Sequence, residues 1–235
     1  MNWLAKVRLN GMATAATPAR PGPVSAHPNL NVRTSNALKE FLWLIGDVPH
    51  ARILDLGPVW QSTVNFLGEK GFRISTEDLL VGWKQFVTDE EERLRIAPVA
   101  PAGEEGEIER LSSSLLAEKF LMGALQYPAE SFHGLLLWDL LDYFDAPAGA
   151  RIMEGLFSIL HPGGVLLALF HSRPAERFNR YRILDAQNVE IVAAPTLAVH
   201  TRVFQNREIL ELFEKFRSSK TFVGRDQVRE ALFLK

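Results

Sequence analysis

The stretch Ala51-Arg-Ile-Leu-Asp-Leu-Gly57 decides the fold of this chain, because a short apolar run ends there in an acid and a glycine turn. A helix is predicted from about Ser62 to Lys70, ended by Gly71, and a second strand, Phe72–Thr76, follows. Strand, helix and strand within roughly 25 residues form a βαβ unit. Its strands must be parallel, because the helical crossover returns the chain to the same end of the sheet.

The second half of the chain repeats this alternation. The runs Gly134–Trp138 and Val165–Phe170 are apolar at every position but the glycine, as in strands buried on both faces, and a helix opens at Pro147 between them. Two later runs, Lys220–Val223 and Val228–Leu234, are joined by a link that allows only an antiparallel hairpin. The sequence therefore predicts a doubly wound α/β domain with a mostly parallel sheet and a C-terminal antiparallel hairpin. No run places a third strand.

The chain divides into a tail and one domain. Residues 1–32 are rich in Pro and Ala and predict a disordered tail, and residues 33–235 form the α/β domain. Two interruptions are expected: a flexible, exposed insertion over about 89–110, and a lid or hairpin over about 173–195, where arginines and a tyrosine cluster. Amphipathic helices are predicted over residues 35–45 and 207–216.

Composition narrows the functional classes. The 235 residues carry a net charge of −2, so neither nucleic acid nor an anionic membrane is an expected partner. The absence of cysteine excludes disulfides, a thiol nucleophile and thiolate metal ligands, and fits a cytoplasmic location. No apolar run is long enough to span a membrane, no signal peptide is expected, and no His-Glu-x-x-His pattern indicates a metal site.

The candidate binding site is the turn after the first strand of the βαβ unit. Ligands of open α/β sheets bind at the carboxyl ends of the strands, where helix N-termini also present free N–H groups. The turn supplies Asp55, Leu56, Gly57, Pro58 and Val59. An acid about 20 residues further on is the residue type that accepts the two hydroxyl groups of a ribose. Two acids stand there, at positions 77 and 78.

In these features the chain resembles the class I S-adenosylmethionine-dependent methyltransferases. Asp55-Leu-Gly57 is similar to the start of their acidic-x-Gly-x-Gly-x-Gly loop, and Glu77 to the ribose-binding acid after their second strand. Tyr127-Pro-Ala-Glu-Ser-Phe-His-Gly-Leu-Leu-Leu-Trp-Asp139 resembles the approach to their fourth strand, and Leu160-His-Pro-Gly-Gly-Val-Leu their turn before the fifth. The resemblance covers roughly residues 35–235. It implies a seven-stranded Rossmann-like sheet.

The same resemblance implies S-adenosyl-L-methionine as cofactor and methyl transfer to an acceptor. Cofactor-binding residues would be the five of the turn together with Glu77, Asp78, Trp138 and Asp139. Asp142 and Tyr143 would face the acceptor, with Asp139 and His171 as candidate catalytic residues. The acceptor, a small molecule or a protein, stays open, as does the oligomeric state.

Departures from the family pattern keep a second function open. Val59 and Gln61 stand at the second and third glycine positions of the loop, and no acid near Met122 matches the adenine contact after the third strand. Glycine is used in such loops because the backbone approaches the ligand closely. The alternative is a catalytically inactive binding or scaffold protein on the same fold. A nicotinamide-dependent oxidoreductase is weaker, because its glycine loop is matched at Gly57 alone.

Overall fold

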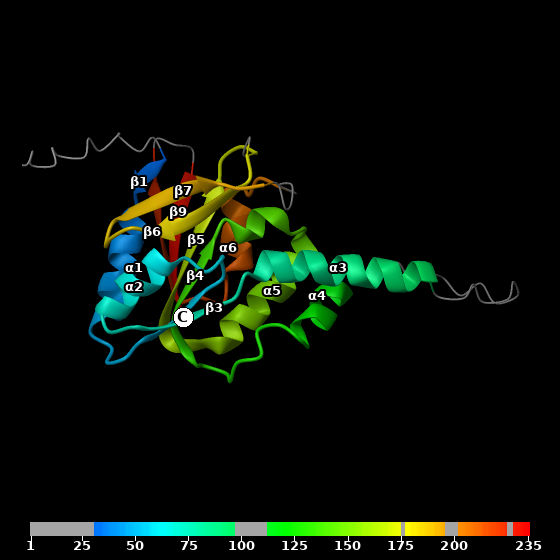
Figure 1. Ribbon diagram of the computed structural model, residues 1–235, viewed down its shortest axis with the longest axis horizontal. Helices are drawn as coiled ribbons and strands as arrows, with labels where there is room; N and C mark the ends of the chain where they lie inside the picture. The colour runs from blue at the N-terminus through cyan, green and yellow to red at the C-terminus, as the bar shows by residue number, and fades with distance from the viewer. Residues whose placement is uncertain (1–30, 97–111, 175–176, 196–201, 225–227) are drawn as a thin grey trace, which may run out of the picture. The chain divides into compact units, whose positions relative to one another are not determined.

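A computed structural model describes residues 31–96, 112–174, 177–195, 202–224 and 228–235 (Figure 1). Its main sheet has six strands in the order β3-β2-β4-β5-β9-β8. The first four are parallel, and β9 is antiparallel to both of its neighbours. In that order the strands are Arg73–Thr76, Arg52–Asp55, Phe132–Trp138, Leu160–His171, Val228–Leu234 and Ser218–Val223.

The sheet agrees with one expectation and leaves another unconfirmed. The expected antiparallel arrangement of the last two strands is present, although their link, residues 225–227, lies outside the described residues. Seven strands were expected, whereas the described residues contribute six. The chain between β3 and β4 is helical over most of its described length, so β3 has no further neighbour on its outer side among the described residues.

Helices cover both faces of the sheet (Figure 1). Alternate strand residues enter two separate cores, as the period of a strand requires: Ile53 and Leu136 pack with one, Leu54 and Leu135 with the other. The first core contains α1 (Asn36–Gly46) and α2 (Gln61–Glu69). The second is covered by α3 (Leu79–Ile96), α4 (Ser113–Leu121), α5 (Ala146–Ile159) and α6 (Asn206–Leu212).

Helix α1 is fixed at its start by a cap and along its length by a glycine opposite it. The Ser35 hydroxyl accepts the N–H of Leu38 at 3.0 Å, as an N-cap should. The ring of Phe41 lies over Gly134 of β4, where an added Cβ would stand 2.5 Å from the Phe41 Cζ. Gly134 therefore allows α1 to approach the sheet closely.

Two predictions for helical regions differ from the structure. The flexible, exposed insertion expected from about residue 89 is wrong for residues 89–96, because these residues belong to α3, which ends at Ile96. There Glu90 is buried and pairs with Arg93 at 2.5 Å and with Lys119 at 3.9 Å. The rest of the expected insertion, 97–110, lies outside the described residues. Helix α6 ends at Leu212, four residues earlier than predicted.

A second sheet has the order β1-β7-β6 and is antiparallel throughout. Its strands are Val32–Thr34, Asn188–Ala193 and Asn179–Ile183, so β6 and β7 fall within the region where a lid or hairpin was expected, and Val32 belongs to the fold rather than the tail. An ion pair joins it to the main sheet: Arg33 contacts Glu230 of β9 at 2.7 Å, and both side chains are buried.

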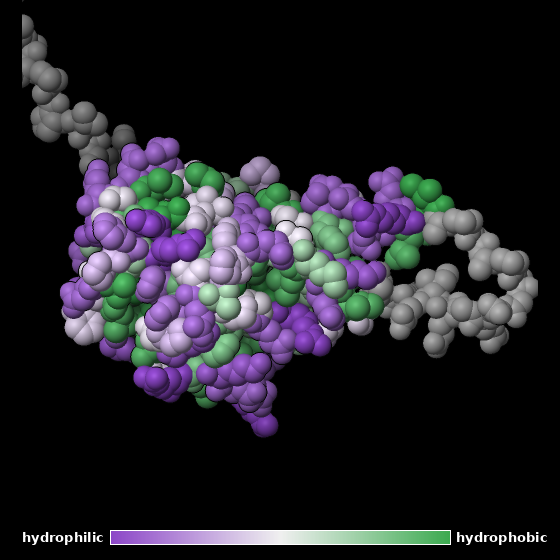
Figure 2. Space-filling view, turned by 90° about the horizontal axis from the view of Figure 1, so that it is seen from below, coloured by the Kyte–Doolittle hydropathy of each residue, from purple (hydrophilic) through white to green (hydrophobic). Residues whose placement is uncertain are grey.

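On the face shown in Figure 2, hydrophilic and hydrophobic residues are interspersed. Among the described residues, no helix is long and apolar enough to cross a bilayer.

Candidate functional site

The site lies where the order of the main sheet reverses. Strand β2 lies between β3 and β4. The connection that leaves β2 leads towards β3, whereas the connection that leaves β4 leads in the opposite direction, so a crevice opens between β2 and β4 at their carboxyl ends. Each of these three strands ends in or next to an acid: Asp55 closes β2, Glu77 follows β3, and Asp139 follows β4. The fold thus gathers three predicted residues at one edge.

Asp55 is sealed beneath the turn that it helps to build. Its Oδ1 accepts the backbone N–H of Gly57 at 3.0 Å and the indole N–H of Trp138 at 2.8 Å. Burial raises the pKa of the Asp55 carboxyl to about 6, and these two hydrogen bonds only partly oppose that rise. Asp55 Oδ1 thus ties the glycine turn to the end of β4.

Trp138 fills the space over the glycine turn. Its φ of 55° is in the left-handed region, which for a bulky residue costs of order 1 kcal/mol or more. A register shift at the end of β4 accompanies that conformation. The indole lies so close to Gly57 that an added Cβ there would stand 3.2 Å from Trp138 Cδ1. The indole ring also stacks on the ring of Tyr181, at 5.5 Å between centroids and 10° between planes.

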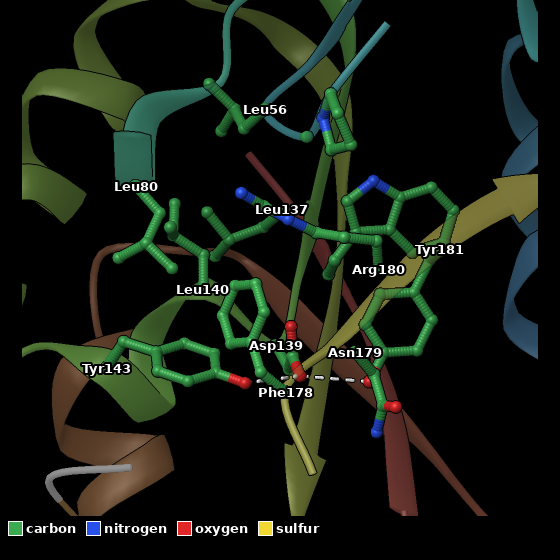
Figure 3. Close-up of a pocket in the computed structure, with 13 residues that line it drawn as sticks. Leu56, Leu80, Leu137, Asp139, Leu140, Tyr143, Phe178, Asn179, Arg180 and Tyr181 are labelled. Atoms are coloured by element: carbon green, nitrogen blue, oxygen red, sulfur yellow. Dashed lines mark hydrogen bonds between the residues drawn. The ribbon is translucent and has the colours of Figure 1, made fainter. Parts of the chain in front are cut away.

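A buried network of acids, tyrosines and a histidine follows β4. Asp139 Oδ2 accepts the hydroxyl of Tyr181 at 2.9 Å and that of Tyr143 at 3.4 Å, as Figure 3 shows. Behind it, Asp142 Oδ2 accepts the backbone N–H of His171 at 3.0 Å and lies 2.8 Å from its Nδ1. The His171 Nδ1 is 3.9 Å from Asp139 Oδ2, so the two carboxylates share one histidine.

The network shifts the pKa values of its members. Burial raises the pKa of Asp139 to about 6, against the opposing charge of His171. Burial alone would lower the pKa of His171, but the hydrogen bond to Asp142 and the charges of both carboxylates raise it above its usual value. Burial and the Asp139 charge raise the pKa values of Tyr143 and Tyr181 far above neutrality, so both phenols stay protonated. Their hydroxyls therefore act as donors to Asp139.

The β6–β7 hairpin covers the site and is held by polar contacts along one strand. Arg180 pairs with Asp78 at 3.0 Å, one residue before Tyr181 reaches Asp139. Two residues after Tyr181, the N–H of Ile183 donates to the Thr63 hydroxyl of α2 at 2.9 Å.

The enclosed space is small. A cavity of about 20 Å³ remains, enough for one water molecule. Its walls come from the glycine turn, the end of β4 and the segment leading into β6: Leu56, Gly57, Pro58, Leu80, Leu137, Trp138, Asp139, Leu140, Tyr143, Phe178, Asn179, Arg180 and Tyr181 (Figure 3).

Not all predicted residues meet at this cavity. Val59 is 66% exposed and does not line it. Glu77 and Asp78 instead line a separate, open groove of about 400 Å³ between α3 and α4, where Glu77 accepts the N–H of Leu125 at 3.1 Å. Asp142 and His171 do not line the cavity.

Sequence reasoning half-found two residues of the wall and missed five others, which are Leu80, Leu137, Leu140, Phe178 and Asn179. Phe178 and Asn179 carried no signal, because an isolated Phe or Asn in a connecting segment has no distinctive pattern. Arg180 and Tyr181 belonged to the cluster that marked the expected lid. Among the described residues, no group of three or more His, Asp or Glu side chains could hold a metal ion.

Comparison with known proteins gives distant likenesses. No protein-family model matches the chain, and no curated protein matches it. A solved structure similar to it is the Burkholderia thailandensis 1,6-didemethyltoxoflavin-N1-methyltransferase, with bound 1,6-didemethyltoxoflavin and S-adenosylhomocysteine. It is 16% identical over 85% of this chain and 76% of that chain, at a TM-score of 0.43.

Two further similar structures are also S-adenosylmethionine-dependent methyltransferases. One, from Archaeoglobus fulgidus, is 10% identical over 84% of this chain and 93% of that chain, with a TM-score of 0.44. The other, from Aquifex aeolicus, is 11% identical over 84% and 88% of the two chains, with a TM-score of 0.39. At such low identity, the function of this chain has to be argued from its own site.

Proposed function

We propose that this chain is an S-adenosylmethionine-dependent methyltransferase whose site is closed in the conformation described. The observation that carries the proposal is the set of three acids, Asp55, Glu77 and Asp139, at the carboxyl ends of adjacent parallel strands beside the switch point of the sheet. This is the place where open α/β sheets bind nucleotide-like ligands.

The chemistry of these acids suits the ligand. S-Adenosylmethionine carries a sulfonium and an ammonium charge, which carboxylates attract, and a ribose diol, whose two hydroxyls a carboxylate accepts. Glu77 is the residue for the diol, since it lies at the end of the strand next to Asp55 and borders an open groove. Asp139 would face the acceptor, because it lines the closed cavity together with aromatic and apolar side chains.

The closed conformation does not admit the cofactor. About 20 Å³ is far below the 300–1,000 Å³ typical of ligand sites, and the Trp138 indole occupies the space against Gly57. Asp78 is paired with Arg180. Binding therefore requires Trp138 and the end of the β6–β7 hairpin to move away.

We also propose that the protein is cytoplasmic, since a chain without cysteine needs no oxidising compartment.

Calorimetric titration with S-adenosylmethionine and S-adenosylhomocysteine tests the proposal. Micromolar binding, about −8 kcal/mol, is expected for the native chain. Glu77→Gln should weaken it about tenfold, because a neutral amide accepts the ribose hydroxyls less strongly than a carboxylate does. Glu69→Gln is the matched control: it makes the same charge change on an exposed residue at the far end of α2.

A complete lack of binding would decide against an enzyme. If neither compound gives heat or a thermal shift at millimolar concentration, the turn around Asp55 is a purely structural element. The chain is then the non-catalytic binding protein that the substituted glycine positions also allow.

A further inference from the structure

Tyr181 lies in the site in the manner of a bound ligand. Its ring stacks on Trp138 with the planes 10° apart, and its hydroxyl donates to Asp139 at 2.9 Å. The side chain is 3% exposed and forms part of the cavity wall, yet it is carried by a strand that is not part of the main sheet. An aromatic hydroxyl compound could make both of these contacts in its place.

We propose that Tyr181 is an internal stand-in for the acceptor, and that the acceptor is a planar aromatic compound with a free hydroxyl group. The slot that Tyr181 occupies binds the ring against Trp138 and the hydroxyl on Asp139. That the bound compound accepts a methyl group rests on the proposed function, whereas the slot itself is defined by the contacts of Tyr181 alone.

The walls of the slot favour a neutral aromatic compound. Arg180 also lines the cavity, but its charge is paired with Asp78. Apart from Asp139, Asn179 and Arg180, the side chains around the slot are aromatic or aliphatic, among them Phe178 and Leu140. A hydroxyl that donates to Asp139 satisfies the one buried carboxylate there. A carboxylate on the ligand would lose its water beside Asp139 and would be repelled by the Asp139 charge. Acidic acceptors are therefore excluded from this position.

Displacement of Tyr181 needs only one end of the hairpin to move. Ile183 and Val189 are buried in the core, and the Ile183–Thr63 hydrogen bond anchors this end to α2. Towards the other end, Arg180 holds the strand through Asp78, in an ion pair whose side chains keep 15% and 22% of their exposure. Partly exposed ion pairs contribute little to stability, so the Arg180–Asp78 pair holds this end of the hairpin only weakly.

The test uses 4-methylphenol, which is the tyrosine side chain itself, and toluene, which lacks only the hydroxyl. Tyr181→Ala empties the slot, and Tyr181→Phe retains the ring as the control for folding. Arg180→Gln removes the ion pair with Asp78 and leaves the Tyr181 side chain in place. Binding is measured by ligand-observed NMR, and opening of β6 by hydrogen exchange of residues 179–183. S-Adenosylhomocysteine is titrated separately against the same proteins.

The expected results follow from the contacts. Tyr181→Ala binds 4-methylphenol about tenfold more tightly than toluene, because only the phenol bonds to Asp139. Arg180→Gln binds 4-methylphenol about fivefold more tightly than the native chain, because a larger fraction of it is open. In both the native chain and Arg180→Gln, 4-methylphenol speeds exchange in β6. With added S-adenosylmethionine, the methyl group passes from the sulfonium sulfur to the phenol oxygen and the phenol proton goes to Asp139, so 4-methylanisole and S-adenosylhomocysteine accumulate together.

Two outcomes overturn the inference. Equal binding of the two compounds by a folded Tyr181→Ala chain would show that no hydroxyl site exists. No binding and unchanged exchange in both the native chain and Arg180→Gln would show that Tyr181 is ordinary core packing. Failure of the methyltransferase proposal is distinct: 4-methylphenol binds while S-adenosylhomocysteine does not, which removes the acceptor role and leaves a phenol site.

Discussion

At the scale of single residues, the buried carboxyl of Asp55 makes stability depend on pH. Its pKa is about 6 in the folded chain against 3.8 in the unfolded one, so the folded state binds more protons between these values. Stability from this group therefore falls as pH rises from about 4 to about 6, by at most about 3 kcal/mol. Asp55→Asn cannot ionise and keeps an oxygen for Gly57 and Trp138, so we expect it to be more stable than the native chain at pH 7.

Urea unfolding at pH 4 and pH 7 measures this effect. The advantage of Asp55→Asn should vanish at pH 4, where the native carboxyl is largely protonated. Asp47→Asn, an exposed residue at the end of α1, supplies the comparison for a change without burial. If Asp55→Asn is instead less stable at pH 7, the negative charge itself supports the turn.

Which residues of the site could be predicted depends on whether their signal is local. Asp55 and Gly57 were predicted, because an acid and a glycine at the end of an apolar run are visible within a few positions. The hydrogen bond from Tyr181 to Asp139 spans 42 positions and depends on how the hairpin folds back over the sheet. No local pattern encodes that contact, so only the presence of a covering segment could be inferred.

At the scale of elements, two glycines in regular structure should respond oppositely to alanine. At Gly134 of β4 the added methyl group meets the ring of Phe41 at 2.5 Å, so Gly134→Ala should push α1 outward and destabilise the fold by about 1–3 kcal/mol. At Gly68 of α2 an added Cβ meets nothing within 4 Å, so Gly68→Ala should stabilise by about 0.5–1 kcal/mol.

Thermal and urea unfolding of both variants measures the pair. Both variants add one methyl group, so opposite changes in the free energy of unfolding would report the space available at each position. A neutral Gly134→Ala would mean that α1 adjusts its distance from the sheet freely.

The elements that were predicted well are those that bury a regular apolar pattern. Within β4 and β5 the runs Gly134–Trp138 and Val165–Phe170 are apolar because both faces are covered, and α1 buries one stripe of its residues. Helix α3 was not predicted, and its acidic run Asp89–Glu92 shows why: it lacks that stripe, and three of those four acids are not buried. A helix with little to bury has no hydrophobic period to read.

At the scale of the whole molecule, the ion pair between Arg33 and Glu230 joins segments 197 positions apart and ties the small sheet to the large one. Arg33→Leu leaves the Glu230 carboxylate, 2% exposed, without its cation, and should cost about 3–5 kcal/mol. Adding Glu230→Gln removes that charge but keeps an oxygen for the N–H of Ala37, which Glu230 accepts at 2.9 Å.

The double variant should therefore be more stable than Arg33→Leu alone. Denaturant unfolding of the native chain, both single variants and the double variant gives the coupling between the two positions. Purely additive losses would show that the pair contributes no interaction of its own.

The position of β9 also has a consequence for the order in which the protein can assemble during translation. This strand lies between β5 and β8, yet it is synthesised after both. Until it emerges from the ribosome, β5 offers an unpaired edge along the apolar run Val165–Phe170, a template for pairing with other chains. A nascent chain stalled before Val228 should therefore aggregate or recruit a chaperone, whereas one that has released β9 can close its own sheet.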